Sequence, residues 1–473
     1  MNYVFGDLET SDSNVNSLSV LEASFCLYDD RFRELEPPFN DSAKIRSTCV
    51  PSLGACLTNG IRTDKLKAAN TSSFDLACRL YKTLNNWGEF CTIGQNFIQF
   101  DHEVLVRLFQ KSLLPDIWFL KKLPRRMMDT LFLARASKLI DDKSLKCEIS
   151  AKGSHLFKLA SLTKMNGILH EKKHSSASDV SATAILAKMI KERVPKLWDS
   201  GLKIAHKSEA KKFIEKSKII SHVAYFYGRA RWYAVKWCYY NSYDYARCWD
   251  LRVSPEDYLK LNYQELKKEL AKTPKVMRTI KPGKFDICLD YSYSFKAEPY
   301  SKIGEAELRK RSSILDANPR FIELIKTIDN DEIEDKKSVD QTELIPEFRL
   351  YKDGFASNRD VENMKLFHKM EWKDRIKLFD RWENSKYSWF NKVLIFEERP
   401  ELLPSSVYKE VQVEFSKRLH TTEDVPWQTF PKFAKELTDY GHKYEKEKNE
   451  KGLQLLNEYD SFVMEMEKKY PKP

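Results

Sequence analysis

Several features that mark other protein classes are absent from this chain of 473 residues. No apolar run reaches the roughly 20 residues that a membrane-spanning helix needs, and the N-terminus lacks a basic segment followed by an apolar core. The nine cysteines are scattered, odd in number and never arranged as Cys-x-x-Cys, which argues against a zinc ribbon and a disulfide framework. We therefore expect a soluble cytoplasmic protein, neither secreted nor bound to a membrane.

A glycine-rich phosphate loop and internal repeats are absent as well, so hydrolysis of nucleoside triphosphates has no support. The length exceeds what one hydrophobic core usually supports, which predicts two or three domains. Hydrophobic residues make up 42% of the chain, and this is enough for packed interiors.

Positive charge is concentrated in one part of the chain. The net charge is +11, and residues 196–290 contain 20 Lys and Arg against 11 Asp and Glu, a local excess of 20 − 11 = +9. Such a basic region favours a polyanionic partner. The alternative for any single lysine is an ordinary solvated surface.

An Asp-x-Glu triplet lies in the segment Phe5–Thr10, directly after the strand-forming residues Tyr3 and Val4. In an extended strand, residues two apart point to the same side, so Asp7 and Glu9 would offer two carboxylates to one point. Oxygen ligands of this kind suit a hard divalent cation. The alternative is an edge strand with two solvated acids.

Two later stretches carry further carboxylates. Asn96–Asp101 places an acid beside Phe100, and we expect Asp101 to begin a helix and the Asn96 side chain to hold the preceding turn. His174–Asp179 opens an apolar helix with a histidine and a fourth acid.

The order Asp-x-Glu, Asn-x-x-x-Phe-Asp and His-x-x-x-x-Asp resembles the three motifs of the DEDDh 3′→5′ exonucleases. Other segments are similar to one branch of these enzymes, the bacterial exonuclease I family, and they extend the resemblance over essentially the full length with the same order and comparable spacing. These segments are Thr58–Ile61, Leu162–Ile168 and Leu350–Phe355.

The resemblance implies a two-metal hydrolytic site with two Mg²⁺ ions, or Mn²⁺ in their place. It assigns Asp7, Glu9 and Asp179 to the first ion, with Asp7 bridging to the second. Asp101 would support the site from across the cleft, and His174 would take a proton from the attacking water. The family commonly has an acidic residue after this histidine, whereas Ser175 follows here, which weakens a supporting role for a carboxylate at that position.

The resemblance also implies contacts with the substrate. The turn that contains Leu57 and Thr58 packs against the terminal nucleotide in the family, and we expect Glu9, Asn96 and Phe100 to face the same nucleotide. Eleven aromatic residues between Val223 and Trp249 are interleaved with basic residues that include Arg229 and Arg231. Those rings that are not core would form a platform on which unpaired bases stack.

The predicted architecture is a mixed α/β multidomain fold. Strands and helices alternate in the first part, and the resemblance specifies a ribonuclease H-like exonuclease domain over residues 1–194. The aromatic stretch reads as antiparallel strands, and the resemblance assigns 195–345 to a Src-homology-3-like barrel that closes over DNA. Helical periodicity predicts a C-terminal helical domain over 346–473.

Boundaries within this scheme follow from local patterns. The charged run Asp329–Lys337 has few apolar residues and is the best candidate for a linker. Asp64 is expected to cap the helix that follows Ile61, and Ser357–Asp360 resembles a capping box. Further helices are expected at Phe74–Trp87, Trp372–Trp382, Val407–Leu419, Phe433–Tyr444 and Leu453–Tyr470.

These features together predict a processive, single-strand-specific 3′→5′ exodeoxyribonuclease that releases 5′-mononucleotides. DNA repair and recombination, a location in the bacterial cytosol or nucleoid, and a single-stranded-DNA-binding protein as partner are implied by the family alone. We expect a monomer. Two alternatives remain: an exonuclease that trims RNA or short oligonucleotides, and a single-stranded-DNA-binding module with a weak site.

Overall fold

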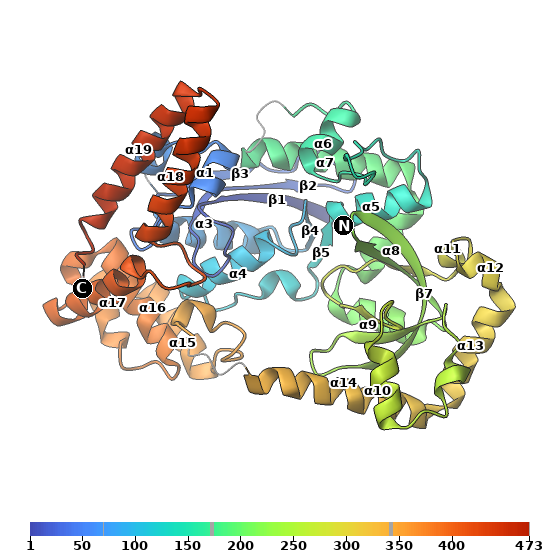
Figure 1. Ribbon diagram of the computed structural model, residues 1–473. Helices are drawn as coiled ribbons and strands as arrows, with labels where there is room; N and C mark the ends of the chain where they lie inside the picture. The colour runs from blue at the N-terminus through green and yellow to red at the C-terminus, as the bar shows by residue number, and fades with distance from the viewer. Residues whose placement is uncertain (70, 171–174, 340–343, 473) are drawn as a thin grey trace.

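The computed structural model describes residues 1–69, 71–170, 175–339 and 344–472. Two five-stranded sheets and many helices form a mixed α/β multidomain fold, as predicted (Figure 1). The first sheet lies at the centre, and the second sheet, with its strand β7 (Arg229–Tyr240), lies at the right. The C-terminal helices occupy the left of the view.

The first sheet has the strand order β3-β2-β1-β4-β5. β1 pairs antiparallel with β2 and parallel with β4, and β4 pairs parallel with β5. Gly6 lets β1 pass directly beneath the Phe25 ring, because a Cβ there would come within 2.2 Å of that ring. The strands are β1 (Asn2–Thr10), β2 (Val20–Tyr28), β3 (Phe39–Ser42), β4 (Phe90–Gly94) and β5 (Arg126–Asp129). The first of these strands confirms the strand predicted to carry Asp7 and Glu9.

Helices cover both faces of this sheet. α3 confirms the amphipathic helix predicted at Phe74–Trp87, and Ser72 caps it by accepting a hydrogen bond from the Asp75 amide. Figure 1 shows α6 and α7 above the sheet and α3 and α4 below it. The helices are α1 (Leu53–Asn59), α2 (Thr63–Ala68), α3 (Ser73–Asn86), α4 (Asp101–Lys111), α5 (Thr130–Ile140), α6 (Leu159–Met165) and α7 (Ser176–Arg193).

The second sheet is antiparallel with the order β10-β6-β7-β8-β9. Its central strands carry the aromatic stretch, as the pattern predicted. Tyr233, Tyr239 and Trp249 are buried, whereas Tyr227 at the β6–β7 hairpin is fully exposed. The strands are β6 (Ile220–Phe226), β7 (Arg229–Tyr240), β8 (Ala246–Asp250), β9 (Met277–Ile280) and β10 (Cys288–Asp290).

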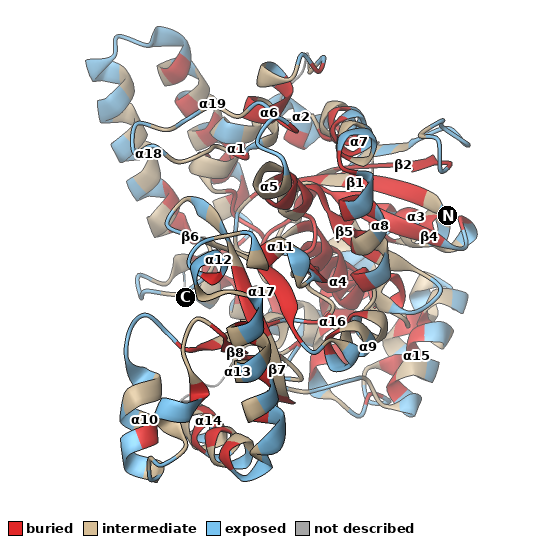
Figure 2. Ribbon diagram, turned by 90° about the vertical axis from the view of Figure 1, so that its right-hand side faces the viewer, coloured by how far each residue is buried: buried red, intermediate tan, exposed pale blue. Residues whose placement is uncertain are grey.

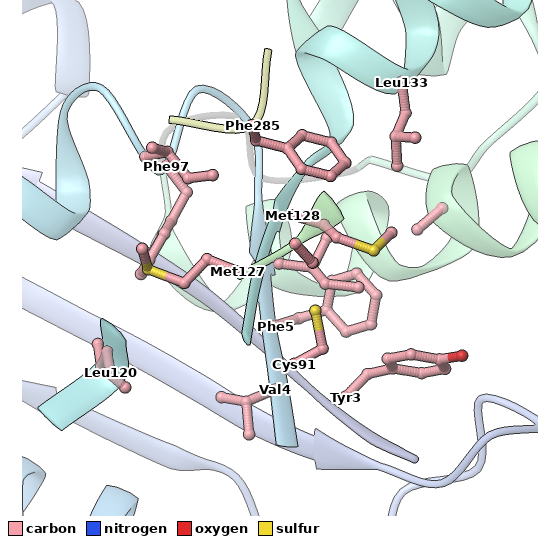
Figure 3. Close-up of a cluster of buried hydrophobic side chains, with 14 of the residues drawn as sticks. Tyr3, Val4, Phe5, Cys91, Phe97, Leu120, Met127, Met128, Leu133 and Phe285 are labelled. Atoms are coloured by element: carbon pink, nitrogen blue, oxygen red, sulfur yellow. The ribbon is translucent and has the colours of Figure 1, made fainter. Parts of the chain in front are cut away.

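One hydrophobic core joins the two sheets. Phe285, from the chain before β10, packs in the same buried cluster as Met128 and Leu133 of the first sheet and its helix (Figure 3). Leu197 and Trp198 of α8 (Pro195–Ile204) lie in this core as well. The domain boundary between residues 194 and 195 stays a prediction. α8 follows this boundary in the chain, but its Leu197 and Trp198 pack in the core that includes the first sheet.

The linker predicted at Asp329–Lys337 is wrong, because this run belongs to the helix α14 (Pro319–Val339). Its acids have partners on the second sheet and its helices: Asp329 pairs with Arg247 at 3.1 Å, and Asp331 accepts a hydrogen bond from the Tyr263 hydroxyl at 2.5 Å. Ile328, directly before this run, adds a buried apolar contact. Tertiary partners therefore compensate for the low apolar content of the run, and α14 extends along the bottom of Figure 1 toward the C-terminal helices.

Most of the predicted C-terminal helices are confirmed. Trp372–Leu378 forms a 3-10 helix in place of the first turns of the helix predicted there, and α16 was missed. Half of the predicted capping box is present, since Ser357 caps α15 but the Asp360 carboxylate turns to the Glu383 and Asn384 amides. The helices are α15 (Asn358–Lys369), α16 (Ser385–Glu398), α17 (Ser405–His420), α18 (Phe430–Lys446) and α19 (Glu450–Glu467).

One predicted helix cap is wrong. Asp64 does not cap α2, because the helix begins one residue earlier and Arg62 occupies the cap.

Among the described residues, no helix is long and apolar enough to cross a membrane. Figure 2 shows buried residues concentrated in the strands of the first sheet and exposed ones on the outer turns of α18 and α19. The remaining helices are α9 (Lys207–Lys216), α10 (Tyr263–Ala271), α11 (Ser292–Phe295), α12 (Tyr300–Ile303) and α13 (Glu305–Ala317).

Candidate metal centre

Asp7 and Glu9 lie on the central strand β1, as the sequence predicted. They are two residues apart, so their side chains share one face of the sheet. Glu9 is opposite Glu22 of β2 in the antiparallel register. Only about 5% of Glu9 is exposed, so its carboxylate is held inside the protein.

Asp101 joins these acids from the first turn of α4. The Leu8 amide, between the two acids of β1, donates a hydrogen bond to Asp101 Oδ1 at 3.1 Å. The backbone of β1 thereby fixes the third carboxylate against the strand that carries the first two. The helix N-terminus also favours a negative charge at this place.

Asp179 comes from α7, which packs on β1 and β2. A hydrogen bond of 2.6 Å between the Ser24 and Ser176 hydroxyls ties the start of this helix to β2. Carboxylate oxygens of Asp7, Glu9 and Asp179 all lie within 4.8 Å of one another. The fold therefore brings together the four acids that the sequence predicted.

Burial and mutual repulsion perturb these acids strongly. Burial, and then the charges of Asp101 and Asp179, raise the pKa of Asp7 well above its usual range. Burial raises the pKa of Glu9 to about 8, with further repulsion from Asp179 and Glu22, and burial raises the pKa of Asp101 to about 8. Buried carboxylates this close cannot all ionise without cations. The donor set, made of carboxylate oxygens alone, fits Mg²⁺ or Mn²⁺.

This electrostatic strain predicts how pH affects the stability of the metal-free protein. Glu9 and Asp101 titrate near pH 4 when the chain is unfolded and near pH 8 when it is folded. Between these values the folded state binds more protons, so stability should fall as pH rises from about 4 to about 8. Mg²⁺ binds the ionised acids, so it should raise the melting temperature more at pH 9 than at pH 5. Thermal melts in EDTA and in Mg²⁺ measure this, and an equal Mg²⁺ effect at both pH values would contradict it.

His174, which the sequence predicts as the proton acceptor, lies outside the described residues. Ser175 occupies the N-cap of α7. The structure instead reveals a histidine that the motif analysis missed: His170 Nε2 contacts Asp179 Oδ1. His170 precedes Asp179 by nine residues, a spacing that belongs to none of the three motifs, so no sequence pattern predicted it.

The turn before Asp101 is held differently from the prediction. We expected the Asn96 side chain to hold it, but Asp129 at the end of β5 accepts hydrogen bonds from the Asn96 and Ile98 amides at 2.9 and 3.1 Å. Asn96 has the left-handed backbone angle φ = 65°, which asparagine tolerates better than most residues. The backbone conformation and Asp129 therefore shape this turn, and Phe100 follows it at the start of α4.

Leu57 and Thr58 lie in the last turn of α1, which Gly60 ends in the left-handed conformation. The Asn59 side chain donates a hydrogen bond to the Thr10 carbonyl at 3.3 Å, so this turn adjoins the end of β1 just beyond Glu9. Arg229 and Arg231 are exposed at the start of β7, in the hairpin with β6. Neither arginine is among the described residues that line the large basic cavity between the two sheets.

A cavity of about 870 Å³ lies between the first sheet, the second sheet and the start of the C-terminal part. Six lysines and arginines and five aromatic rings line it, and Glu103 is the one carboxylate among the described lining residues. Burial, and then repulsion from Lys284, lowers the pKa of Lys121 to about 8, so an anion bound near Lys121 would stabilise its charged form. The basic and aromatic lining residues are Lys121, Lys122, Arg125, Arg126, Lys207, Lys284, Trp118, Tyr243, Tyr245, Tyr351 and Phe355.

Curated proteins similar in sequence share one name, exodeoxyribonuclease I. The relative from Buchnera aphidicola of Schizaphis graminum is 28% identical over 234 residues, which is 49% of this chain and 48% of the relative. The relative from Buchnera of Acyrthosiphon pisum is 30% identical over 166 residues, 35% of this chain and 40% of the relative. The Escherichia coli protein is 26% identical over 197 residues, 42% of this chain and 41% of the relative. The matched part thus spans no more than about half of these relatives, and no family model matches.

Solved structures extend the similarity in fold to nearly the whole chain. E. coli exonuclease I in complex with a dA16 oligonucleotide superposes with a TM-score of 0.82 at 20% identity, over 98% of this chain and 99% of that one. An ExoI/SSB-Ct complex has a TM-score of 0.80 with the same coverage and identity. The similarity to curated exodeoxyribonuclease I proteins and the shared fold therefore confirm the resemblance to bacterial exonuclease I that the motifs predicted.

Proposed function

We propose that this protein is a processive 3′→5′ exodeoxyribonuclease that acts on single-stranded DNA and releases 5′-mononucleotides, with a role in DNA repair and recombination. The observation that carries the proposal is the convergence of Asp7, Glu9 and Asp179 within 4.8 Å, with Asp101 bound to the same strand. Three of these carboxylates, Asp7, Glu9 and Asp101, have pKa values raised by burial and by one another, and such a cluster suits divalent metal ions rather than a structural role.

Asp7, Glu9 and Asp179 would hold the first of two Mg²⁺ ions, and Asp7 and Asp101 would hold the second. Bound ions would neutralise the charge that develops on the phosphate and lower the pKa of the attacking water. The α1 turn with Leu57 and Thr58, together with Glu9, Asn96 and Phe100, would orient the terminal nucleotide. His174 would accept the proton of the water, a role that suits an imidazole near neutral pH.

The cavity beside α4 supports a single strand as substrate. Ammonium and guanidinium groups would bind phosphates, and rings such as Trp118 and Tyr351 would stack on bases, a combination typical of single-strand binding. Glu103, which lines this cavity, lies on the same helix as Asp101, so a strand held in the cavity would reach the metal centre along α4. Arg229, Arg231 and the exposed Tyr227 would contact the strand from the hairpin.

The remaining expectations belong to the same proposal. The chain would act as a monomer in the cytoplasm, with domains at 1–194, 195–345 and 346–473, and would bind a single-stranded-DNA-binding protein. The solved ExoI/SSB-Ct complex, which has the same fold, supports this partner. Trimming of RNA is the second candidate, since none of the site residues distinguishes a 2′-hydroxyl.

A substrate comparison tests the proposal. Single-stranded DNA, blunt duplex DNA and RNA of the same sequence, each labelled at the 5′ end, would be incubated with Mg²⁺ or EDTA. We expect shortening of the single-stranded DNA alone, and only with Mg²⁺. Faster shortening of RNA would favour the trimming enzyme, and retarded migration without cleavage in any divalent metal would favour the binding module.

A further inference from the structure

A buried histidine bridges the candidate metal ligand Asp179 to the helix α6. The His170 side chain is only 5% exposed, and its Nε2 contacts Asp179 Oδ1. Its other nitrogen, Nδ1, lies 3.2 Å from the Thr163 hydroxyl. Both ring nitrogens are therefore engaged, which fixes the plane of the imidazole.

Local backbone structure brings this histidine to its place. After α6, Gly167 adopts the left-handed angle φ = 68°, and the Ile168 amide donates a hydrogen bond to the Thr163 carbonyl at 2.9 Å. The chain thus reverses and brings His170 back beside Thr163. Thr163 is itself buried, and its hydroxyl lies 3.2 Å from the Ala160 carbonyl within the same helix.

We propose that His170 is a positioning residue that holds the Asp179 carboxylate in the orientation needed for metal binding. This inference rests on the proposed metal-dependent function. A carboxylate turns about its Cβ–Cγ bond, and repulsion from Asp7 and Glu9 would turn Asp179 away from them. The contact with His170 opposes this rotation, because the ring is buried and its other nitrogen is held beside the Thr163 hydroxyl. Metal-ligating carboxylates are commonly supported by such hydrogen bonds, whose loss typically weakens metal affinity or activity about 10- to 100-fold.

This role differs from the one proposed for His174. A residue that accepts the proton of the attacking water determines the rate at saturating metal. A residue that orients a ligand determines how much metal is needed. The two histidines should therefore separate in a titration with metal.

Three substitutions test the inference. His170→Phe keeps a flat ring without hydrogen bonds, His170→Gln restores a donor near the place of Nε2, and Thr163→Val removes the hydroxyl while leaving the imidazole intact. Affinity for Mn²⁺ is measured by calorimetry without DNA, and cleavage of single-stranded DNA is measured against Mg²⁺ concentration. Circular dichroism checks that each variant is folded.

We expect His170→Phe to weaken Mn²⁺ binding about 10- to 100-fold and to raise the Mg²⁺ requirement equally, with kcat at saturating Mg²⁺ within a few-fold of wild type. His170→Gln should recover part of the affinity, and Thr163→Val should lose a smaller part. If His170→Phe does not fold, Thr163→Val decides alone. Wild-type affinity in the folded variants, or a loss confined to kcat, would overturn the inference. A wild-type protein that neither binds Mn²⁺ nor cleaves DNA would overturn the proposed function itself.

Discussion

Asp7→Asn is expected to abolish Mg²⁺-dependent cleavage of single-stranded DNA while raising the melting temperature of the metal-free protein. The loss of activity should be about 1,000-fold or more, because a bound metal ion contributes several kcal/mol to the transition state. The gain in stability follows from the pKa of Asp7, which burial and the neighbouring acids raise well above its usual range. A neutral amide removes the charge that the folded state tolerates least.

The two effects are measured with one pair of proteins, by cleavage rates in Mg²⁺ and by thermal melts in EDTA. Asp64→Asn is the matched control, since its carboxylate is 70% exposed on α2 and lies outside the acidic cluster. It should change neither quantity beyond the error of measurement. A lower melting temperature for Asp7→Asn in EDTA would show that the acids do not repel one another in the folded protein.

Glu103→Ala should cause a large loss of stability, because three parts of the chain meet on this one carboxylate. It accepts hydrogen bonds from Arg107 at 2.9 Å, from Lys284 near the second sheet at 2.7 Å, and from the Tyr351 hydroxyl at 2.6 Å. Burial alone would raise the pKa of Glu103, but the neighbouring His102 and the hydrogen bonds from Lys284 and Tyr351 hold it well below its usual range. Removing one partner from a buried ion pair leaves the others uncompensated and costs about 3–5 kcal/mol.

Urea denaturation measures this cost. Glu305→Ala is the matched control, because Glu305 also pairs with an arginine, Arg309 at 2.6 Å, but is 55% exposed. Such exposed pairs contribute about 0–1 kcal/mol. Equal effects of the two substitutions would mean that Glu103 does not join the three parts.

The four acids could be predicted from the sequence because each belongs to a short local pattern. Asp7 and Glu9 need only a strand with a period of two, and Asp101 and Asp179 need only the start of a helix. The structure confirms both kinds of element. The resemblance to a known family then joined the three patterns, which spacing alone leaves unconnected.

Other features depend on contacts between segments that are distant in the chain, so local sequence patterns could not predict them. His170 and Asp129 act through partners on other elements, and neither lies in a recognisable motif. The charged run in α14 was misread as a linker because its stabilising partner Arg247 lies 82 residues away in the chain. Burial of polar groups in ion pairs and hydrogen bonds is a property of the fold rather than of composition.

The most direct test of the central claim is the order in which label leaves a single-stranded DNA with different labels at its two ends. In Mg²⁺ we predict that the 3′ label is released first, as a 5′-mononucleotide, while the 5′ label stays on a shortening strand. The release should stop with EDTA and with Asp179→Ala. First release of the 5′ label, or of internal fragments carrying either end, would contradict the account.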